Sequence, residues 1–374
     1  MPSHLVDPSF SATRAHIHMD RLRSNVQAIQ QRMPGLDMMG VVKADAYGHG
    51  SVEVATALRD MGIRHFGVAT VGEAASLRAA GIKESIMVFA PLSSPHVKAS
   101  TALCLDVVID STESLEAARG TDGRLRCHIK VDTGMGRLGR TPEDSIDIVR
   151  GIEADTRLDM GSIWTHFARA DEPDHPMTGQ QISRFMDFIE TLGGAPAPLH
   201  VAASAGVFAH PDSIDPNLFS MARVGIALYG LLDLPGARPP SPLSPVMEFS
   251  STVTSLKHVS AGTPISYGSR WKAPAETWIA TVGAGYADGV SRTLSGKGRV
   301  RIGNELYPIV GTVCMDMFMV NLGKNPFEVR VGDNAILFGK SAPTAFEVAD
   351  HMDSITYVPV CAVSSRVPRD YVLG

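Results

Sequence analysis

The chain has 374 residues, 44% of them hydrophobic, and a formal net charge of −5 at pH 7. This length accommodates a barrel and a smaller second domain, and the hydrophobic fraction is enough for a large core. The slight negative charge, with no basic run, argues against nucleic acid as a partner. No apolar stretch reaches membrane-spanning length, so we expect no membrane association.

The cysteines and histidines show no metal-binding spacing. Four cysteines lie far apart without a CxxC pair, and 13 histidines show no HExxH-like arrangement. These spacings argue against a disulfide framework and a zinc knuckle, and we predict no catalytic metal. Residues 1–7 lack the basic and apolar regions of a signal peptide, so we expect a cytoplasmic protein.

From about residue 37 to 230, short apolar runs alternate with segments of helical period. The runs expected to form strands are 38–43, 65–69, 86–89, 106–110, 126–132, 160–166, 199–203 and 222–228. The amphipathic segments between them are Ser51–Met61, Val71–Ala80, Ser111–Ala118, Pro142–Gly151 and Gly179–Leu192. Strands separated in this way by helices predict a (β/α)8 TIM-type barrel rather than an open sheet.

A proline-rich segment, Leu234–Pro245, interrupts this pattern, and we place a domain boundary there. Beyond it, strands joined by Gly or Pro turns are expected at Val246–His258, Trp278–Val282, Arg299–Ile302, Tyr307–Val310, Met317–Leu322 and Asn334–Phe338, with a short helix at Phe346–Met352. The expected fold class is α/β, with an N-terminal barrel in residues 1–244 and a mostly-β C-terminal domain in residues 245–374. A strand-like run, Ala15–Met19, precedes the barrel.

The run VVKADAYGHG, residues 41–50, places Lys43 after an apolar segment and before a glycine-rich turn. Burial at a strand end disfavours the charged form of a lysine. A neutral amine is a nucleophile that forms a Schiff base with an aldehyde such as pyridoxal phosphate. The alternative is a lysine that reaches solvent, followed by glycines that only form a turn.

Barrel enzymes build their sites at the carboxyl ends of the strands and often bind phosphate after strands seven and eight. Ser204 ends the seventh predicted strand, and Arg223, Gly225 and Ile226 lie on the eighth. Because Gly225 lets the backbone approach closely, the amides of residues 225 and 226 can face phosphate oxygens, with the hydroxyls of Ser204 and Tyr47 as further donors. Alternatively, Ser204 is a helix N-cap and Arg223 forms a barrel salt bridge.

Motifs along the whole chain resemble those of alanine racemases. Besides the lysine run they are HIKVDTGMGRLG (128–139), THFA (165–168) with ADE (170–172), RVGIALYG (223–230), ISYG (265–268), GYADG (285–289), GTVCMD (311–316) and RVPR (366–369). Each motif alone is weak, but their number and order make the similarity specific. In this family the strand before the barrel, residues about 13–20 here, pairs with the C-terminal domain.

The resemblance implies a homodimeric pyridoxal phosphate enzyme that interconverts L-alanine and D-alanine and supplies D-alanine as a peptidoglycan precursor. Lys43 would hold the cofactor, and Tyr47 would bind its phosphate. Arg137 would contact the cofactor's phenolic oxygen and the substrate carboxylate, while Arg223 would face the pyridine nitrogen. A guanidinium cannot accept a proton, so it discourages protonation of the ring nitrogen and weakens the ring as an electron sink.

Racemisation removes a proton from one face of Cα and returns one to the other, which two acid–base groups do most directly. Lys43 is one, and the resemblance implies that Tyr267 from the other subunit is the second. His166, held by Arg223, would be the neighbour that favours the tyrosine's phenolate. From the residues alone, Tyr267 also fits an ordinary hairpin tyrosine, and His166 a core histidine.

The resemblance assigns four further positions. Met315 would cross the dimer interface and bring its amide to the substrate carboxylate, with Asp316 behind it, and Tyr286 would line the substrate entrance. Lys130 corresponds to a lysine that is often carbamylated in this family, where the anion orients the arginine. The simpler alternative is an unmodified Lys130 paired with a carboxylate.

Two positions depart from the family pattern. Ala203 stands where the family usually has Asn, so one polar cofactor contact is missing or supplied otherwise. Ser365 stands where the family commonly has Tyr, which leaves room near the substrate and favours, as the alternative, a broader serine/alanine racemase.

A decarboxylase with the same architecture would place an acidic group where Arg223 lies. A non-enzymatic cofactor-binding protein would lack residues 246–374.

Overall fold

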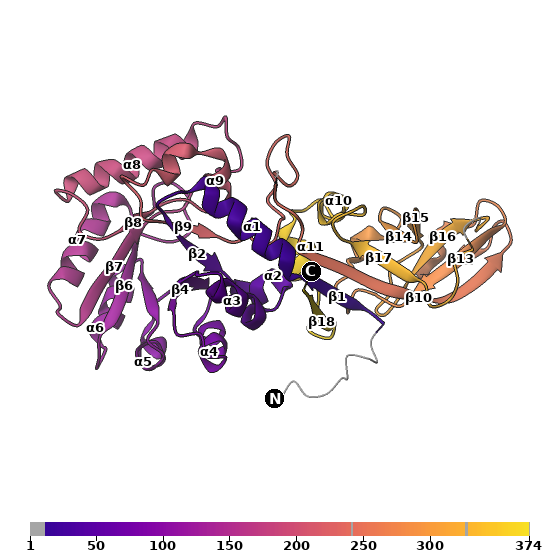
Figure 1. Ribbon diagram of the computed structural model, residues 1–374, viewed down its shortest axis with the longest axis horizontal. Coiled ribbons are helices and arrows are strands. Elements are labelled where there is room, and N and C mark those ends of the chain that lie inside the picture. Colours follow the sequence, from indigo (N-terminus) through magenta and orange to yellow (C-terminus); the bar gives the residue numbers. More distant parts are fainter. Residues whose placement is uncertain (1–11, 241, 326–327, 374) are drawn as a thin grey trace.

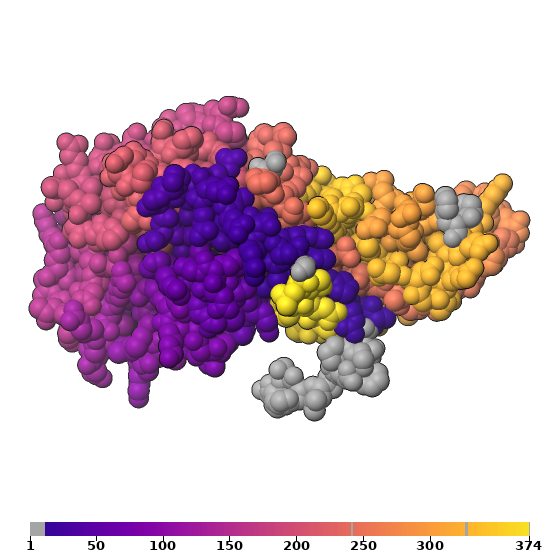
Figure 2. All heavy atoms as spheres, viewed as in Figure 1, coloured from indigo at the N-terminus to yellow at the C-terminus, as the bar shows by residue number. Residues whose placement is uncertain are grey.

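The structure is a computed structural model that describes residues 12–240, 242–325 and 328–373. The expectation about a signal peptide concerns residues 1–7, which lie outside these ranges. The molecule is elongated, with an α/β part in indigo to magenta and an antiparallel β part in orange to yellow (Figure 1). Figure 2 shows that the two parts are in contact along one continuous surface.

Parallel strands form the first sheet, in the order β8-β7-β6-β5-β4-β3-β2-β9. Their bounds are β2 Asp37–Val41, β3 His65–Val68, β4 Ser85–Pro91, β5 Asp106–Ile109, β6 Leu125–Lys130, β7 Leu158–Trp164, β8 Leu199–His200 and β9 Met221–Val224. A backbone hydrogen bond from Arg223 N to Ala202 O, 3.0 Å long, joins β9 to the segment after β8. This bond closes the sheet, and the predicted α/β barrel is confirmed.

Helices cover the outside of the barrel. The predicted ones are observed as α3 Ser51–Asp60, α4 Val71–Ala79, α6 Thr112–Arg119, α7 Pro142–Glu153 and α8 Met177–Thr191. Two more, α1 Met19–Arg32 and α5 Ser94–Ala102, were not predicted. α1 buries Leu22, Val26, Ala28 and Ile29 at helical spacing, so the sequence carried an amphipathic signal for this helix that was not used.

Seven of the eight predicted barrel strands end earlier than expected, and three of them end beside a candidate site residue. β2 ends at Val41, so Lys43 begins α2 (Lys43–Gly48) instead of ending a strand. Ser204 begins α9 (Ser204–Ala209), and Gly225 lies in the turn beyond β9. In all three places the chain leaves the sheet, so these residues lie just beyond the carboxyl ends of the strands.

The second sheet follows the order β13-β16-β15-β14-β17-β10-β1-β18, and β10 also pairs with β13. Its bounds are β1 Arg14–His18, β10 Met247–Val259, β13 Thr277–Val282, β14 Arg299–Ile302, β15 Glu305–Val310, β16 Phe318–Gly323, β17 Asn334–Phe338 and β18 Arg369–Val372. The remaining elements are β11 Pro264–Ile265, β12 Trp271–Lys272, α10 Ala345–His351 and α11 Tyr357–Cys361. The C-terminal part is therefore mostly β, as predicted.

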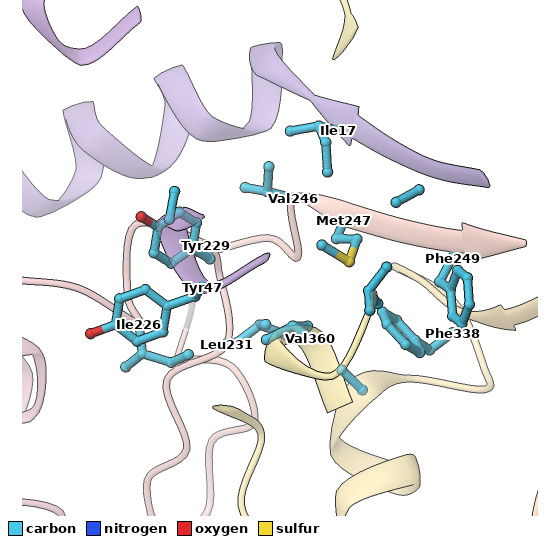
Figure 3. Packing of buried hydrophobic residues seen from close by; sticks show 14 of the residues in the cluster. Ile17, Tyr47, Ile226, Tyr229, Leu231, Val246, Met247, Phe249, Phe338 and Val360 are labelled. Carbon is cyan, nitrogen blue, oxygen red and sulfur yellow. The ribbon is translucent and has the colours of Figure 1, made fainter. Parts of the chain in front are cut away.

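The strand that precedes the barrel belongs to the second sheet. β1 pairs antiparallel with β10 and parallel with β18. One hydrophobic core continues from the barrel into the β part. Figure 3 shows Tyr229 and Ile226 of the barrel end, Met247 of β10 and Val360 of α11 within this core. Among the described residues, no helix is both long and apolar enough to cross a membrane.

Candidate active site

The segment after β2 is a left-handed helical turn. Residues 44–47 have φ between 51° and 54° and ψ between 41° and 50°. Each such non-glycine residue costs about 1–2 kcal/mol, so the surroundings must hold the turn in place. Ala44 N donates to the Glu73 carboxylate at 2.8 Å, and Ser51 N donates to Asp45 at 2.8 Å. The turn carries Lys43 at its start and Tyr47 near its end.

The environment of Lys43 favours its neutral form. The side chain is half-buried where α2 begins. Burial, followed by the positive charge of Arg137, lowers the pKa of Lys43 below its ordinary value. The amine is therefore a better nucleophile and base near neutral pH than an exposed lysine would be.

Backbone amides and hydroxyls beside α2 form a cradle that fits a phosphate group. Ser204 Oγ accepts hydrogen bonds from Gly225 N at 3.1 Å and from Ala227 N at 3.3 Å. Ile226 N donates to no residue that the structure describes. A Cβ on residue 225 would lie 2.5 Å from Tyr47 Oη, so only glycine fits there. The Tyr47 and Ser204 hydroxyls and these amides offer donors to an anion.

Arg223 is a buried guanidinium without a carboxylate partner among the described residues. Its Nη1 donates to His200 Nδ1 at 2.6 Å, and its Nη2 donates to Thr165 O at 2.7 Å and to Val201 O at 2.9 Å. Burial, and then the charge of Arg137, lowers the pKa of Arg223 to about 9, so it stays protonated at neutral pH. Nε donates to no described residue, which leaves this N–H for a ligand.

Two further titratable side chains adjoin Arg223. His166 Nδ1 accepts a hydrogen bond from Arg223 Nη2 at 3.1 Å, and burial, then the charge of Arg223, lowers the pKa of His166. Burial and the same charge lower the pKa of Lys130 to about 7. Lys130 Nζ donates to Val131 O at 2.7 Å, but no carboxylate pairs with it among the described residues. The ion pair expected for an unmodified Lys130 is therefore not observed.

Arg137 lies on the loop after β6. The Asp132 carboxylate at the start of this loop accepts hydrogen bonds from the amides of Gly134, Met135 and Gly136, all between 2.9 and 3.2 Å. Arg137 itself is exposed and donates no hydrogen bond to the described residues. Its guanidinium is therefore available to an anionic ligand on the side of the site that Lys43 occupies.

The predicted residues of the β part form a separate exposed group. Tyr267, Met315 and Tyr286 are 73%, 53% and 44% exposed. Short hydrogen bonds hold their segments together: Thr312 Oγ1 donates to Tyr267 O at 3.0 Å, and Tyr286 N donates to Cys314 O at 3.0 Å. We refer to the two tyrosines Tyr267 and Tyr286, together with the neighbouring Met315, as the exposed aromatic group.

Within one chain, Tyr267 lies away from Lys43. Tyr267 lies in a groove of about 550 Å³ whose wall includes Ile279 of β13 and Met319 of β16. In Figure 1, β13 and β16 lie at the outer end of the β part, whereas α2 lies at the junction with the barrel. The predicted site residues are thus divided into two groups within one chain.

The positions that depart from the family pattern lie on loops. Ser365 is exposed in the turn between α11 and β18. The next residue, Arg366, forms ion pairs with Asp288 at 2.7 Å and with Asp316 at 2.8 Å. Ala203 precedes Ser204 and forms a parallel bridge with Arg223, so it contributes backbone but no polar side chain.

Sequence reasoning missed two residues behind Arg223. His200 is the nearest acceptor of the guanidinium, and Trp164 lies under it with its ring centroid 4.6 Å from Arg223 Cζ. The two residues are register partners on β8 and β7. A histidine within a buried strand next to an expected buried arginine was the available signal, but such histidines are more often core residues.

Both parts of the chain match family models. Residues 17–233 match "Alanine racemase, N-terminal domain", and residues 246–371 match "Alanine racemase, C-terminal domain". The alanine racemase of Chlorobaculum tepidum is 40% identical over 370 residues, which cover 96% of this chain and 94% of that protein. This chain belongs to the alanine racemase family. The alanine racemase of Thermobifida fusca is 38% identical over 375 residues, or 96% of this chain and 98% of that one.

Solved alanine racemases share the whole architecture. The structure from E. faecalis superposes with a TM-score of 0.90 at 37% identity and covers 97% of this chain and 98% of its own. The structure from Streptomyces lavendulae gives a TM-score of 0.89 at 34% identity, with the same coverage of both chains. The barrel and the β part therefore form the fold of the alanine racemase family, and the predicted family is confirmed.

Proposed function

We propose that this family member interconverts L-alanine and D-alanine with pyridoxal phosphate as cofactor. The observation that carries the proposal is the meeting of Lys43, the phosphate cradle and Arg223 at one end of the barrel. The relatives named alanine racemase, which cover nearly the full length of the chain, support the same conclusion.

The residues present fit the cofactor. Tyr47, Ser204 and the amides of Gly225 and Ile226 would bind its phosphate, and Arg223 Nε would face its ring nitrogen. Bound pyridoxal phosphate would supply an electron-withdrawing ring that makes the Cα hydrogen of the amino acid acidic. Because Arg223 is a donor that stays protonated, it would keep the ring nitrogen unprotonated and limit this withdrawal.

The chain's own side chains would move the protons. The Lys43 amine, whose pKa is lowered by burial and then by the charge of Arg137, would take or return the Cα proton on one face. The Tyr267 hydroxyl would serve the opposite face, with His166 beside it. Arg137 would bind the substrate carboxylate through its free guanidinium, and the Met315 amide would add a second donor to that carboxylate.

A composite site requires a second copy of the chain. Tyr267 lies away from Lys43 in its own chain, and three large side chains exposed together favour a protein partner. In the proposed homodimer, each copy would supply Lys43 to one site and Tyr267, Met315 and Tyr286 to the other. We place the enzyme in the cytoplasm, where it would supply D-alanine for peptidoglycan.

The test is a racemisation assay of the purified protein with pyridoxal phosphate, started separately from L-alanine and from D-alanine. Both reactions should approach the same equal mixture of enantiomers. The Lys43→Ala protein is the matched control, because it lacks only the proposed cofactor lysine. Release of carbon dioxide, or no change in optical rotation from either enantiomer, would contradict the proposed reaction.

A second substrate is favoured by one residue. Ser365 places a small exposed side chain where the family commonly has a tyrosine ring. We propose that this space admits serine as a minor substrate, since Lys43, Arg137 and Tyr267 act on atoms that alanine and serine share. The same assay with L-serine would test this alternative.

A further inference from the structure

Behind Arg223, four side chains form a buried path through the barrel interior. It begins at His200 on β8, whose Nδ1 lies 2.6 Å from Arg223 Nη1 and whose Nε2 lies 2.8 Å from Ser162 Oγ on β7. It continues from Ser162 Oγ to His128 Nδ1 on β6, at 2.6 Å. It ends with His128 Nε2 at 3.5 Å from the Asp106 carboxylate on β5. All of these residues are buried.

The chemistry of each link fixes where its proton lies. Arg223 can only donate, so His200 Nδ1 must accept and His200 carries its proton on Nε2. Ser162 accepts that proton and directs its own hydrogen to His128 Nδ1. His128 then carries its proton on Nε2, which has no other partner among the described residues and faces Asp106. Every donor therefore points away from Arg223 and towards the carboxylate.

Asp106 is the anionic end of this path. Burial would raise the pKa of Asp106, but the facing His128 ring and then the hydrogen bond from the Ser85 hydroxyl lower it on balance. The other charged or titratable groups that interact with Asp106 include Arg126, His65, Arg78 and Cys127. An ionised carboxylate thus lies at the opposite end of the path from a guanidinium that has no carboxylate of its own.

We propose that Asp106, His128, Ser162 and His200 are positioning residues that fix the orientation of the Arg223 guanidinium through a chain of polar contacts across the barrel. The inference rests on the proposed function, in which Arg223 Nε faces the cofactor ring. A carboxylate in contact with the ring nitrogen would favour its protonation, whereas a carboxylate behind three neutral groups orients Arg223 without touching the ring.

The first test uses the protein without cofactor, labelled with ¹⁵N in its histidine rings. Long-range ¹⁵N–¹H spectra report which ring nitrogen carries the proton. His200 and His128 should both be protonated on Nε2 only. In Asp106→Asn, the His200 signal should shift although the two residues do not touch, because the intervening hydrogen bonds couple them. Asp147→Asn is the control: it removes an exposed carboxylate on α7, whose ion-pair partner is Arg150, and should leave His200 unchanged.

Protonation of His200 on Nδ1, or a doubly protonated His128, would overturn the proposal. So would a His200 signal that is unchanged in Asp106→Asn while the His128 signal shifts. These spectra require neither cofactor nor turnover. They therefore remain valid if the unmodified enzyme proves inactive with alanine, and that result would count against the proposed function alone. If both substituted proteins fail to fold, the proton positions in the unmodified protein decide.

The second test uses the cofactor-loaded enzyme. Ser162→Ala and Asp106→Asn should each lower kcat about ten-fold, as loss of an orienting partner commonly does, and should change KM less than about two-fold. Because Arg223 faces the ring, the visible absorption of the bound cofactor should also shift. A folded Asp106→Asn enzyme with unchanged kcat and unchanged absorption would overturn the proposal, as would equal losses in Asp147→Asn.

Discussion

At the scale of single residues, the site depends on basic side chains that burial makes less basic. Lys43, Lys130 and Arg223 all have lowered pKa values, and burial is the largest cause for each. Arg223 nevertheless remains protonated at neutral pH, because its pKa of about 9 starts from the highest ordinary value. The site therefore combines the guanidinium charges of Arg137 and Arg223 with amines whose neutral forms burial favours.

Lys43 is the proposed attachment point of the cofactor, and chemical trapping tests it. Borohydride reduction of the loaded protein should fix the cofactor to the peptide that contains Lys43, as mass analysis of the digest would show. The Lys130→Arg protein is the matched control, because it removes the other amine with a lowered pKa and should still be labelled at Lys43. A cofactor fixed to Lys130 in the unmodified protein would contradict the assignment.

Lys130 is expected to accept carbon dioxide. With its pKa at about 7, most of its amine is neutral at about pH 8, and a neutral amine forms a carbamate with release of one proton. Carbon-13 NMR in labelled bicarbonate should therefore show a carbamate signal that weakens at about pH 6, where the amine is protonated. The signal should vanish in Lys130→Arg. A spectrum that is identical for both proteins would rule the modification out.

Ser365 is expected to set the discrimination between alanine and serine. A pocket tuned by packing changes by only about 1–3 kcal/mol per small group, so we expect alanine to stay preferred and serine turnover to be measurable. Ser365→Tyr should lower kcat/KM for serine relative to alanine by at least about ten-fold. Ser364→Ala is the neighbouring control. An unchanged ratio would direct attention to another pocket residue, such as Phe89.

At the scale of elements, the left-handed turn of α2 packs closely against the turn after β9. Gly225 has no Cβ, and this lets Tyr47 Oη approach. Gly225→Ala should therefore displace Tyr47 and weaken cofactor binding at least about ten-fold, as a titration of cofactor fluorescence would measure. In the Tyr47→Phe background the hydroxyl is gone, so the same change should cost less. Equal losses in both backgrounds would contradict the steric account.

The sequence predicted regular elements better than the turns that hold the site. Arg299–Ile302 and Asn334–Phe338 were placed as the structure has them. The first alternates charged and apolar residues and the second is a short continuous apolar run, and either pattern between turns indicates a strand. The left-handed turn was not predicted, since residues 44–47 contain no glycine and nothing local favours positive φ there. Contacts with Glu73 and within the turn hold this backbone, and such contacts cannot be read from a short window.

At the scale of the whole molecule, the motifs along the chain predicted the family and the two-part fold, and both are confirmed. The boundary after residue 244 and the roles of the site residues stay predictions. The proposed composite site could not be derived from spacing, because it would bring Tyr267 and Lys43 together from two associated chains. The path from His200 to Asp106 was not predicted for a similar reason, since its residues come from four different strands.

The central claim is that Lys43 and Tyr267 act at one site from two copies of the chain. Mixing inactive Lys43→Ala and Tyr267→Phe proteins in equal amounts, with subunit exchange verified, tests it most directly. Random assortment makes about half of the dimers hybrids, and each hybrid has one intact site out of two. The account therefore predicts recovery of about a quarter of the native alanine racemisation rate. Complete exchange without any recovery of activity would contradict it.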